Sequence, residues 1–182
     1  MAIQPGTYEL GPQNGKLLVR TTKGGAASKA GHNLLLKVER WTGTARFADD
    51  LAQSVLELNA DSTSLTVLEG TGGMRALDGD DKQGIADTIN QEVLEGTRIT
   101  FKSTAVRPDG DDRLHVTGDL ELVNSLNRLA FDIIVADDGR VTGMATVKQT
   151  EWGMNPYSAL FGTLKVTDEV GVEIDAQLLP AS

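Results

Sequence analysis

Residues 31–47 (GHNLLLKVERWTGTARF) constrain the fold more than any other stretch, because apolar residues alternate along most of this segment. The first half places every second residue on one face: His32, Leu34, Leu36 and Val38. Near Arg40 the parity changes, and a second set shares a face: Trp41, Gly43, Ala45 and Phe47. A period of two is typical of a half-buried strand, and the change of parity predicts a bulge or bend, for which Gly43 is the candidate. A long, bent, one-sided strand predicts a barrel.

The composition is that of one globular domain spanning residues 1–182, with 40% hydrophobic and 24% charged residues. The net charge is −9, and the 17 basic residues are scattered along the chain. Nucleic acids and anionic membrane surfaces both require clustered Lys and Arg. We therefore expect neither as a partner.

The chain has no cysteine, so disulfides and thiolate chemistry are excluded. The first residues, MAIQPGTYELG, show neither the basic nor the apolar region of a secretory leader, although removal of a leader would give the same appearance. No apolar run approaches the length of a membrane-spanning helix. We expect a cytoplasmic protein without a membrane span.

Most of the remaining chain repeats the strand pattern, with tight turns such as Asn14-Gly15 and the Asp-Asp-Gly at 137–139. One segment, residues 62–97, breaks this rhythm. There Asp80 or Asp81 can cap a helix, a stripe recurs at every fourth residue, and Gly96 stands where a helix would end; the stripe is Ile85, Ile89 and Val93. We expect one inserted helix that buries this stripe at the mouth or flank of an antiparallel barrel or sandwich.

Known catalytic and cofactor motifs are absent from the sequence. The glycine-rich stretch at 70–75 (GTGGMR) lacks the strand and helix context of a dinucleotide site and the lysine of a phosphate loop. The two histidines have no partners at metal-ligand spacing. Asp78, Asp80 and Asp81 resemble a calcium loop only until Lys82, and a helix-capping turn is the better interpretation. We predict no catalytic residue, no metal and no cofactor.

Two groups of residues allow both a structural and a functional interpretation. His32 lies on an apolar face, where it either hydrogen-bonds within the core or anchors the headgroup of a ligand. His115 falls on a polar face and is expected to be exposed. Three of the scarce aromatic residues and a methionine gather in one loop: Trp152, Met154, Tyr157 and Phe161. This loop either plugs a barrel end or forms a portal for a ligand.

Spaced blocks across nearly the whole chain resemble the YceI-like family of polyisoprenoid-binding proteins. The blocks are PGTYELGPQNGKLLVRT at the start, Ala30-Gly31-His32 with Gly43 and Phe47, an I-x-F-x-S strand at 99–103, a V-x-G-x-L-x-L strand at 116–122, and the closing WGMNPYSALFGTLKVTDEVGVEIDAQL. The chain departs from the family in two places. MRALDGDDKQGI replaces an Arg-Asp-x-x-Leu element, and Asn124 stands where a glycine is usual.

The resemblance implies an all-β fold, an antiparallel lipocalin-like β-barrel of about eight strands with one inserted helix near its mouth. It also implies a non-enzymatic protein that binds a long-chain isoprenoid or other lipid in the barrel lumen. The residues agree with this, since the interior faces are aliphatic and small residues that leave space recur on them: Gly43, Ala45, Gly118, Gly143 and Ala145. Burial of an apolar tail contributes about 0.8 kcal/mol per CH₂ before ordering costs.

From the alternation we predict lining residues along several strands. They are Leu34, Leu36, Val38, Trp41, Phe101, Leu120, Phe131, Ile133 and Trp152, with His32 and Tyr157 as polar contacts near an opening. Two alternatives stay open: an enzyme acting on an amphiphile with His32 as acid or base, and a barrel filled by its own side chains that serves as an interaction or stress-response module. Exposed strand edges would also allow a homodimer.

Overall fold

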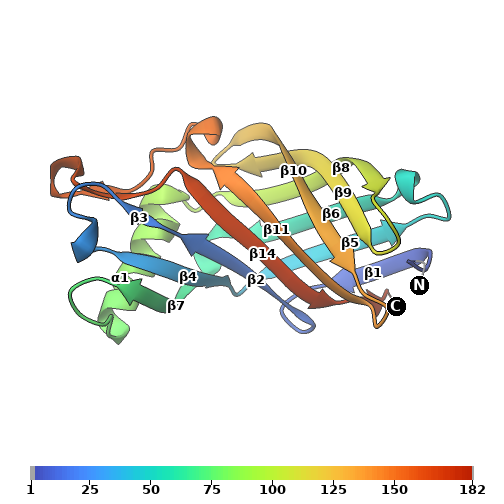
Figure 1. The fold of residues 1–182 in the computed structure, drawn as a ribbon, viewed down its shortest axis with the longest axis horizontal. Coiled ribbons are helices and arrows are strands. Elements are labelled where there is room, and N and C mark those ends of the chain that lie inside the picture. The colour runs from blue at the N-terminus through green and yellow to red at the C-terminus, as the bar shows by residue number, and fades with distance from the viewer. Residues whose placement is uncertain (1–2, 182) are drawn as a thin grey trace.

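The computed structural model describes residues 3–181, which form mainly antiparallel strands (Figure 1). Within this range, twelve strands make one strongly curled sheet in the order β15-β1-β5-β6-β8-β9-β10-β11-β14-β2-β4-β7. Their bounds are β1 (Gly6–Leu10), β2 (Gly15–Thr21), β4 (His32–Val38), β5 (Trp41–Phe47), β6 (Val55–Asp61), β7 (Leu65–Gly72), β8 (Arg98–Pro108), β9 (Arg113–Leu122), β10 (Ser125–Val135), β11 (Arg140–Lys148), β14 (Glu169–Gln177) and β15 (Leu179–Pro180). The predicted all-β, lipocalin-like barrel is confirmed. The strands outnumber the predicted eight because bends divide the longer ones.

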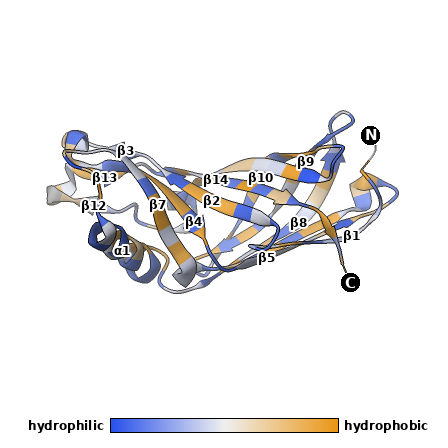
Figure 2. Cartoon of the chain, turned by 90° about the horizontal axis from the view of Figure 1, so that it is seen from below, coloured by the Kyte–Doolittle hydropathy of each residue, from blue (hydrophilic) through white to orange (hydrophobic). Residues whose placement is uncertain are grey.

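A second, smaller sheet lies at the end of the molecule opposite both termini (Figures 1 and 2). It has the order β12-β13-β3, with β3 (Lys23–Gly24), β12 (Ser158–Ala159) and β13 (Leu164–Val166). Short helical turns connect the strands: η1 (Ser28–Ala30), η2 (Leu51–Gln53), η3 (Ser62–Ser64), η5 (Gln149–Trp152) and η6 (Leu160–Gly162).

The curl of the large sheet follows from its connections. β1 and β2, β4 and β5, and β6 and β7 are consecutive in the chain, yet the members of each pair lie near opposite ends of the strand order. The connectors are short; only Glu39 and Arg40 separate β4 from β5. Because each residue spans at most about 3.6 Å, the two ends of the sheet must lie close together. The chain thus passes from one end of the sheet to the other through bent strands, as the pattern of residues 31–47 predicts.

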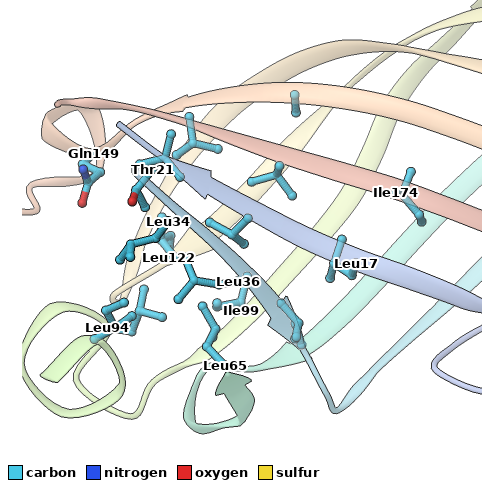
Figure 3. Close-up of a pocket in the computed structure, with 18 of the residues that line it drawn as sticks. Leu17, Thr21, Leu34, Leu36, Leu65, Leu94, Ile99, Leu122, Gln149 and Ile174 are labelled. Atoms are coloured by element: carbon cyan, nitrogen blue, oxygen red, sulfur yellow. The ribbon is translucent and has the colours of Figure 1, made fainter. Parts of the chain in front are cut away.

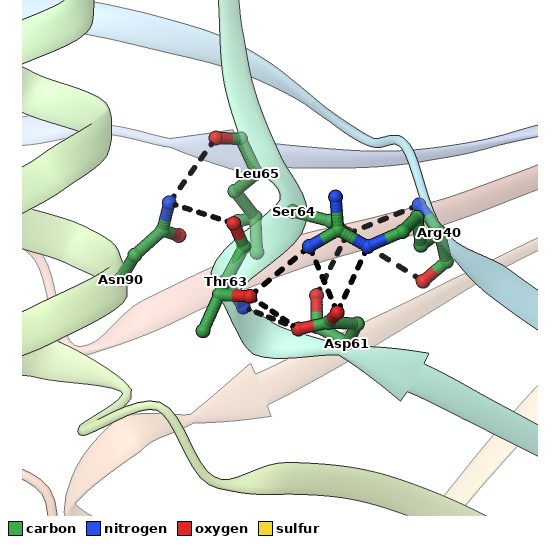
Figure 4. A network of polar contacts seen from close by, with 6 residues as sticks. All are labelled: Arg40, Asp61, Thr63, Ser64, Leu65 and Asn90. Carbon is green, nitrogen blue, oxygen red and sulfur yellow. Dashed lines mark hydrogen bonds and ion pairs between the residues drawn. The ribbon is translucent and has the colours of Figure 1, made fainter.

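Two of these bends lie side by side and hold each other in place. The backbone N–H of Asp61 donates to the carbonyl of Arg40 at 3.0 Å, and that of Glu39 donates to Ser64 at 3.0 Å. The Arg40 guanidinium pairs with the Asp61 carboxylate at 2.8 Å and also donates to the Thr63 hydroxyl (Figure 4). The hydroxyl and N–H of Thr63, followed by Arg40, hold the pKa of Asp61 below its usual value.

The bend lies where the parity of the sequence changes, but the glycine predicted to form it is not part of it. The bend lies at Glu39 and Arg40, whereas Gly43 stands within regular pairing, opposite Leu10 on β1 and Leu58 on β6. A Cβ at Gly43 would come within 3.2 Å of the Leu10 side chain. The glycine therefore serves close packing and not the corner.

The inserted helix is present as α1 (Gly79–Thr88), continued by a π-helical turn, η4 (Ile89–Val93). Asp78 is the N-cap in place of the predicted Asp80 or Asp81, because its carboxylate accepts from the Asp81 N–H while Asp81 accepts from the Asp78 N–H. Gly96 adopts a left-handed φ of +63° beyond the helix end, as expected for a terminating glycine. The Asn90 amide joins the helical segment to the bend between β6 and β7 by donating to the carbonyls of Thr63 and Leu65 (Figure 4).

The end of the barrel near the termini is filled by side chains. Val106 on β8 and Leu114 and Val116 on β9 are each 1% exposed or less, and Val106 stands opposite Val116. No helix among residues 3–181 is long and apolar enough to cross a membrane. The closely packed region around Val106, Leu114 and Val116 is called the packed end below.

Candidate functional site

The barrel encloses a cavity of about 850 Å³, which extends toward the end that carries α1 and the small sheet (Figure 3). This volume lies within the range of small-molecule sites. Most of its wall is aliphatic, as shown by residues such as Leu17, Leu36 and Ile174. Small residues widen it, since Gly43, Ala45, Gly143 and Ala145 all stand in the wall.

All but two of the predicted lining residues stand in this wall. They are His32, Leu34, Leu36, Val38, Phe101, Leu120, Phe131, Ile133 and Tyr157. Phe101 and Phe131 contact each other with ring centroids 5.3 Å apart. The structure therefore brings these side chains together around one cavity. Their contact with a ligand stays a prediction.

The two tryptophans do not stand in the wall. Trp152 is 2% exposed, and its indole N–H donates to the carbonyl of Leu120 at 2.8 Å, which holds the ring in the core beside β9. Trp41 is 4% exposed and packs in the core at the start of β5, directly after the bend. Alternation gives the face of a strand, but it does not show where a bend or a loop diverts a side chain from the lumen.

Gly118 also serves a different purpose from the predicted one. It stands outside the cavity wall, and a Cβ on it would overlap the ring of Phe101. The glycine makes room for this ring, which itself faces the cavity. Its effect on the lumen is therefore indirect.

Several wall residues are missing from the sequence prediction. β2 and β14 contribute Leu17, Val19, Val172 and Ile174, and the helical segment contributes Ile85, Ile89 and Val93. The sequence signals for them are the alternation in β2 and β14 and the four-residue stripe in the helix. The helix stripe thus closes part of the barrel mouth.

Polar groups gather where the cavity opens. The ring of His32 donates from Nε2 to the carbonyl of Arg75 at 2.7 Å, so this histidine fixes the loop between β7 and α1 while also standing in the wall. Gly73 allows the approach, because it has a φ of +74° and any Cβ on it would overlap the imidazole. His32 combines the two interpretations of its sequence position, a structural hydrogen bond and a place at the opening.

An ion pair fastens the same loop to the helix. The Arg75 guanidinium contacts both carboxylate oxygens of Asp81 at 2.6 and 2.7 Å. The bond from Arg75 lowers the pKa of Asp81 to about 2, with the Asp78 N–H as a further cause. Asp78, Asp80 and Asp81 all stand at this rim of the opening and make it acidic.

His115 lies away from the cavity wall. His115 is half-exposed on the outer face, and its Nδ1 lies 2.8 Å from an oxygen of Asp132. Of the loop that gathers soft and aromatic residues, Trp152 and Met154 are buried, whereas Tyr157 and Phe161 are exposed. Within residues 3–181, no three His, Asp or Glu side chains are arranged to hold a metal ion.

Comparison with known proteins identifies the fold. No family model and no curated protein sequence matches the chain. Among solved structures, BcnA of Burkholderia cenocepacia superposes with a TM-score of 0.63 at 16% identity, covering 88% of this chain and 94% of BcnA. The YceI protein of Campylobacter jejuni superposes with a TM-score of 0.57 at 10% identity, covering 81% and 84% respectively. A mutant of that protein, crystallised with a monobromobimane guest, superposes equally well. The chain has a YceI-like fold.

Proposed function

We propose that this chain, with its YceI-like fold, binds and carries a long-chain apolar molecule of the polyisoprenoid or a similar lipid class. The ligand occupies the barrel cavity, and the protein performs no chemistry on it. The observation that carries the proposal is the cavity itself, which has about 850 Å³ and a mainly aliphatic wall.

The energetics of such a site favour a long tail without charged contacts. Each buried CH₂ contributes about 0.8 kcal/mol, and the gain must exceed the cost of ordering the chain. The charged residues of the wall are Lys23, Asp78, Asp80, Asp81 and Lys165 at the opening, together with Glu57. The carboxylate of Glu57 is already held by Arg46 and Lys102. A tail that lies inward and a polar headgroup near the opening match this distribution.

The cavity counts against a barrel filled by its own side chains. The imidazole of His32 also has a structural partner, since its Nε2 donates to the Arg75 carbonyl. This bond favours a binding role over an acid or base role. The cytoplasmic location and the homodimer stay predictions from the sequence.

The test is mass spectrometry of the purified protein. An organic extract and the intact protein under native conditions should both show one apolar molecule per chain. Phe131→Asp places a carboxylate in the cavity wall and should abolish retention of this molecule. Because Phe131 is only half-buried, the variant is expected to fold.

Ile134→Asp is the matched control, since Ile134 stands on the same strand but outside the cavity wall and is 38% exposed. It should retain the ligand. A folded Phe131→Asp variant with undiminished ligand would overturn the proposal.

A further inference from the structure

The small sheet and its loops form one side of the cavity opening, here called the lip (residues 22–31 and 155–167). Gly31, Leu164, Val166 and other residues of the lip stand in the cavity wall. The lip lies at the end of the molecule farthest from both termini (Figure 2). A lipid that enters by this opening therefore passes beside the lip.

The lip has a charge opposite to that of the chain. It contains Lys23, Lys29 and Lys165, and no acidic residue. Because the whole chain carries −9 and the lip contributes +3, the remainder carries −12. Lys29 and Lys165 are exposed, whereas Lys23 donates to the carbonyl of Gly31 at 2.9 Å. The scattered basic residues of the sequence thus include a local cationic group that only the fold brings together.

An aromatic side chain protrudes from the same lip. Phe161 is fully exposed, at 107% of its reference area, and Tyr157 is 44% exposed. Phe161 also has a φ of +56°, a left-handed conformation that is uncommon for a bulky residue. A side chain that buries nothing and disfavours its own backbone conformation contributes no stability to the fold. Its position calls for a contact outside the molecule.

Backbone hydrogen bonds hold the lip as one unit. The N–H of Ala27 donates to the carbonyl of Thr163 at 2.8 Å, and that of Thr167 donates to Thr22 at 2.8 Å. Within the second segment, the N–H of Val166 donates to Tyr157 at 2.9 Å. The lysines and Phe161 are therefore presented together on one support.

We propose that the lip docks on the surface of an anionic phospholipid bilayer, with Phe161 inserted among the headgroups and Lys29 and Lys165 above the lipid phosphates. Phe side chains of membrane-bound segments are buried at the boundary between headgroups and acyl chains, and lysines near an anionic surface add to the attraction. A single protruding ring suits insertion into a bilayer better than a flat or grooved interface with another protein. Docking sets the lip side of the cavity opening against the membrane.

The experiment is cosedimentation of the full chain with vesicles of phosphatidylcholine alone or mixed with phosphatidylglycerol. The protein should sediment with the mixed vesicles, and added salt should weaken binding because it screens exposed charges. Phe161→Asn should reduce the partition coefficient about tenfold, since most of the apolar gain of one ring is lost. Asparagine tolerates the left-handed conformation, so folding is preserved.

Reversal of the two exposed charges, Lys29→Glu with Lys165→Glu, should reduce binding at least about twentyfold at low salt. The matched controls lie away from the lip: Leu179→Asn, which removes a 43% exposed side chain near the C-terminus, and Lys16→Glu with Arg107→Glu, which makes the same change in net charge. These controls should bind like the parent.

Three outcomes would overturn the inference: no sedimentation with mixed vesicles at low salt, equal losses in lip and control variants, or sedimentation caused by self-association without vesicles. The inference does not require a filled cavity. Phe131→Asp should lose the lipid yet bind vesicles like the parent, whereas Phe161→Asn should keep the lipid and bind vesicles about tenfold more weakly. Failure of one proposal is therefore distinguishable from failure of the other.

Discussion

The two ends of the barrel are built on different principles. Near the termini, side chains such as Leu114 and Val116 fill the interior, and long antiparallel ladders surround them. At the opening, the loop between β7 and α1 is fixed mainly by polar contacts, from His32 to Arg75 and from Arg75 to Asp81. Solvent reaches most of these groups, since the side chain of Arg75 is 65% exposed.

This difference separates stability from access. Close packing of buried side chains contributes most of the favourable free energy of a fold, whereas exposed ion pairs contribute little. The packed end should therefore open only when the whole molecule unfolds. The opening should loosen at a lower cost, which is what entry of a ligand requires.

The largest effect is expected at the packed end. Leu114 is 1% exposed and stands outside the cavity wall, so Leu114→Ala leaves a void among close-packed side chains. We expect a loss of about 3 kcal/mol in the free energy of unfolding. Urea denaturation measures it. A loss below about 1 kcal/mol would show that this end is not packed as described.

A smaller effect is expected at the opening. Asp78→Ala removes the N-cap of α1 and with it half of the capping box. The expected loss is about 1 kcal/mol. Hydrogen exchange resolved along the chain should increase in α1 and η4 and stay unchanged in β8 and β9. An equal increase in both regions would show that the two ends do not open separately.

The body of the barrel was predictable from the sequence because a period of two records which face of a strand is buried. Residues such as Leu36, Phe131 and Ile133 stand in the cavity wall as the alternation indicates. The pattern also predicts that residues 31–47 bend. The change of parity near Arg40 locates the bend, which lies at Glu39 and Arg40. It does not show the role of Gly43, since a glycine in a strand is compatible with both a corner and close packing, and Gly43 packs closely against Leu10.

The opening was less predictable because its residues come together from distant segments. Nothing in the sequence around His32 indicates a bond to the carbonyl of Arg75, 43 positions away. Likewise Lys29 and Lys165 share one lip only because β3 pairs with β13. Trp41 and Trp152 show the same limit, since a bend and a loop place them in the core and not in the lumen.

Lowering the pH from about 4 to 2 should loosen the loop between β7 and α1 at the opening. The pKa of Asp81 in the folded protein is about 2, against an ordinary value of 3.8, because Arg75 bonds to its ionised form. A lowered pKa means that this contact stabilises the fold above about pH 4 and is lost as the pH falls toward 2. Pepsin should therefore cleave within residues 73–95 increasingly over this range. Asp81→Asn should make cleavage there rapid already at pH 4, and an unchanged pH profile in this variant would contradict the assignment.

The smallest effect on stability is expected at the tip of the lip, where Phe161 contacts neither the packed end nor the cavity wall. Phe161→Asn removes a side chain that is fully exposed and held at a φ of +56°. The free energy of unfolding should change by less than about 0.5 kcal/mol, and any change should stabilise, because asparagine accepts this conformation more readily. Thermal unfolding compared with the parent measures it. A clear destabilisation would mean that the ring packs within the protein and would remove the reason to seek its contact in a membrane.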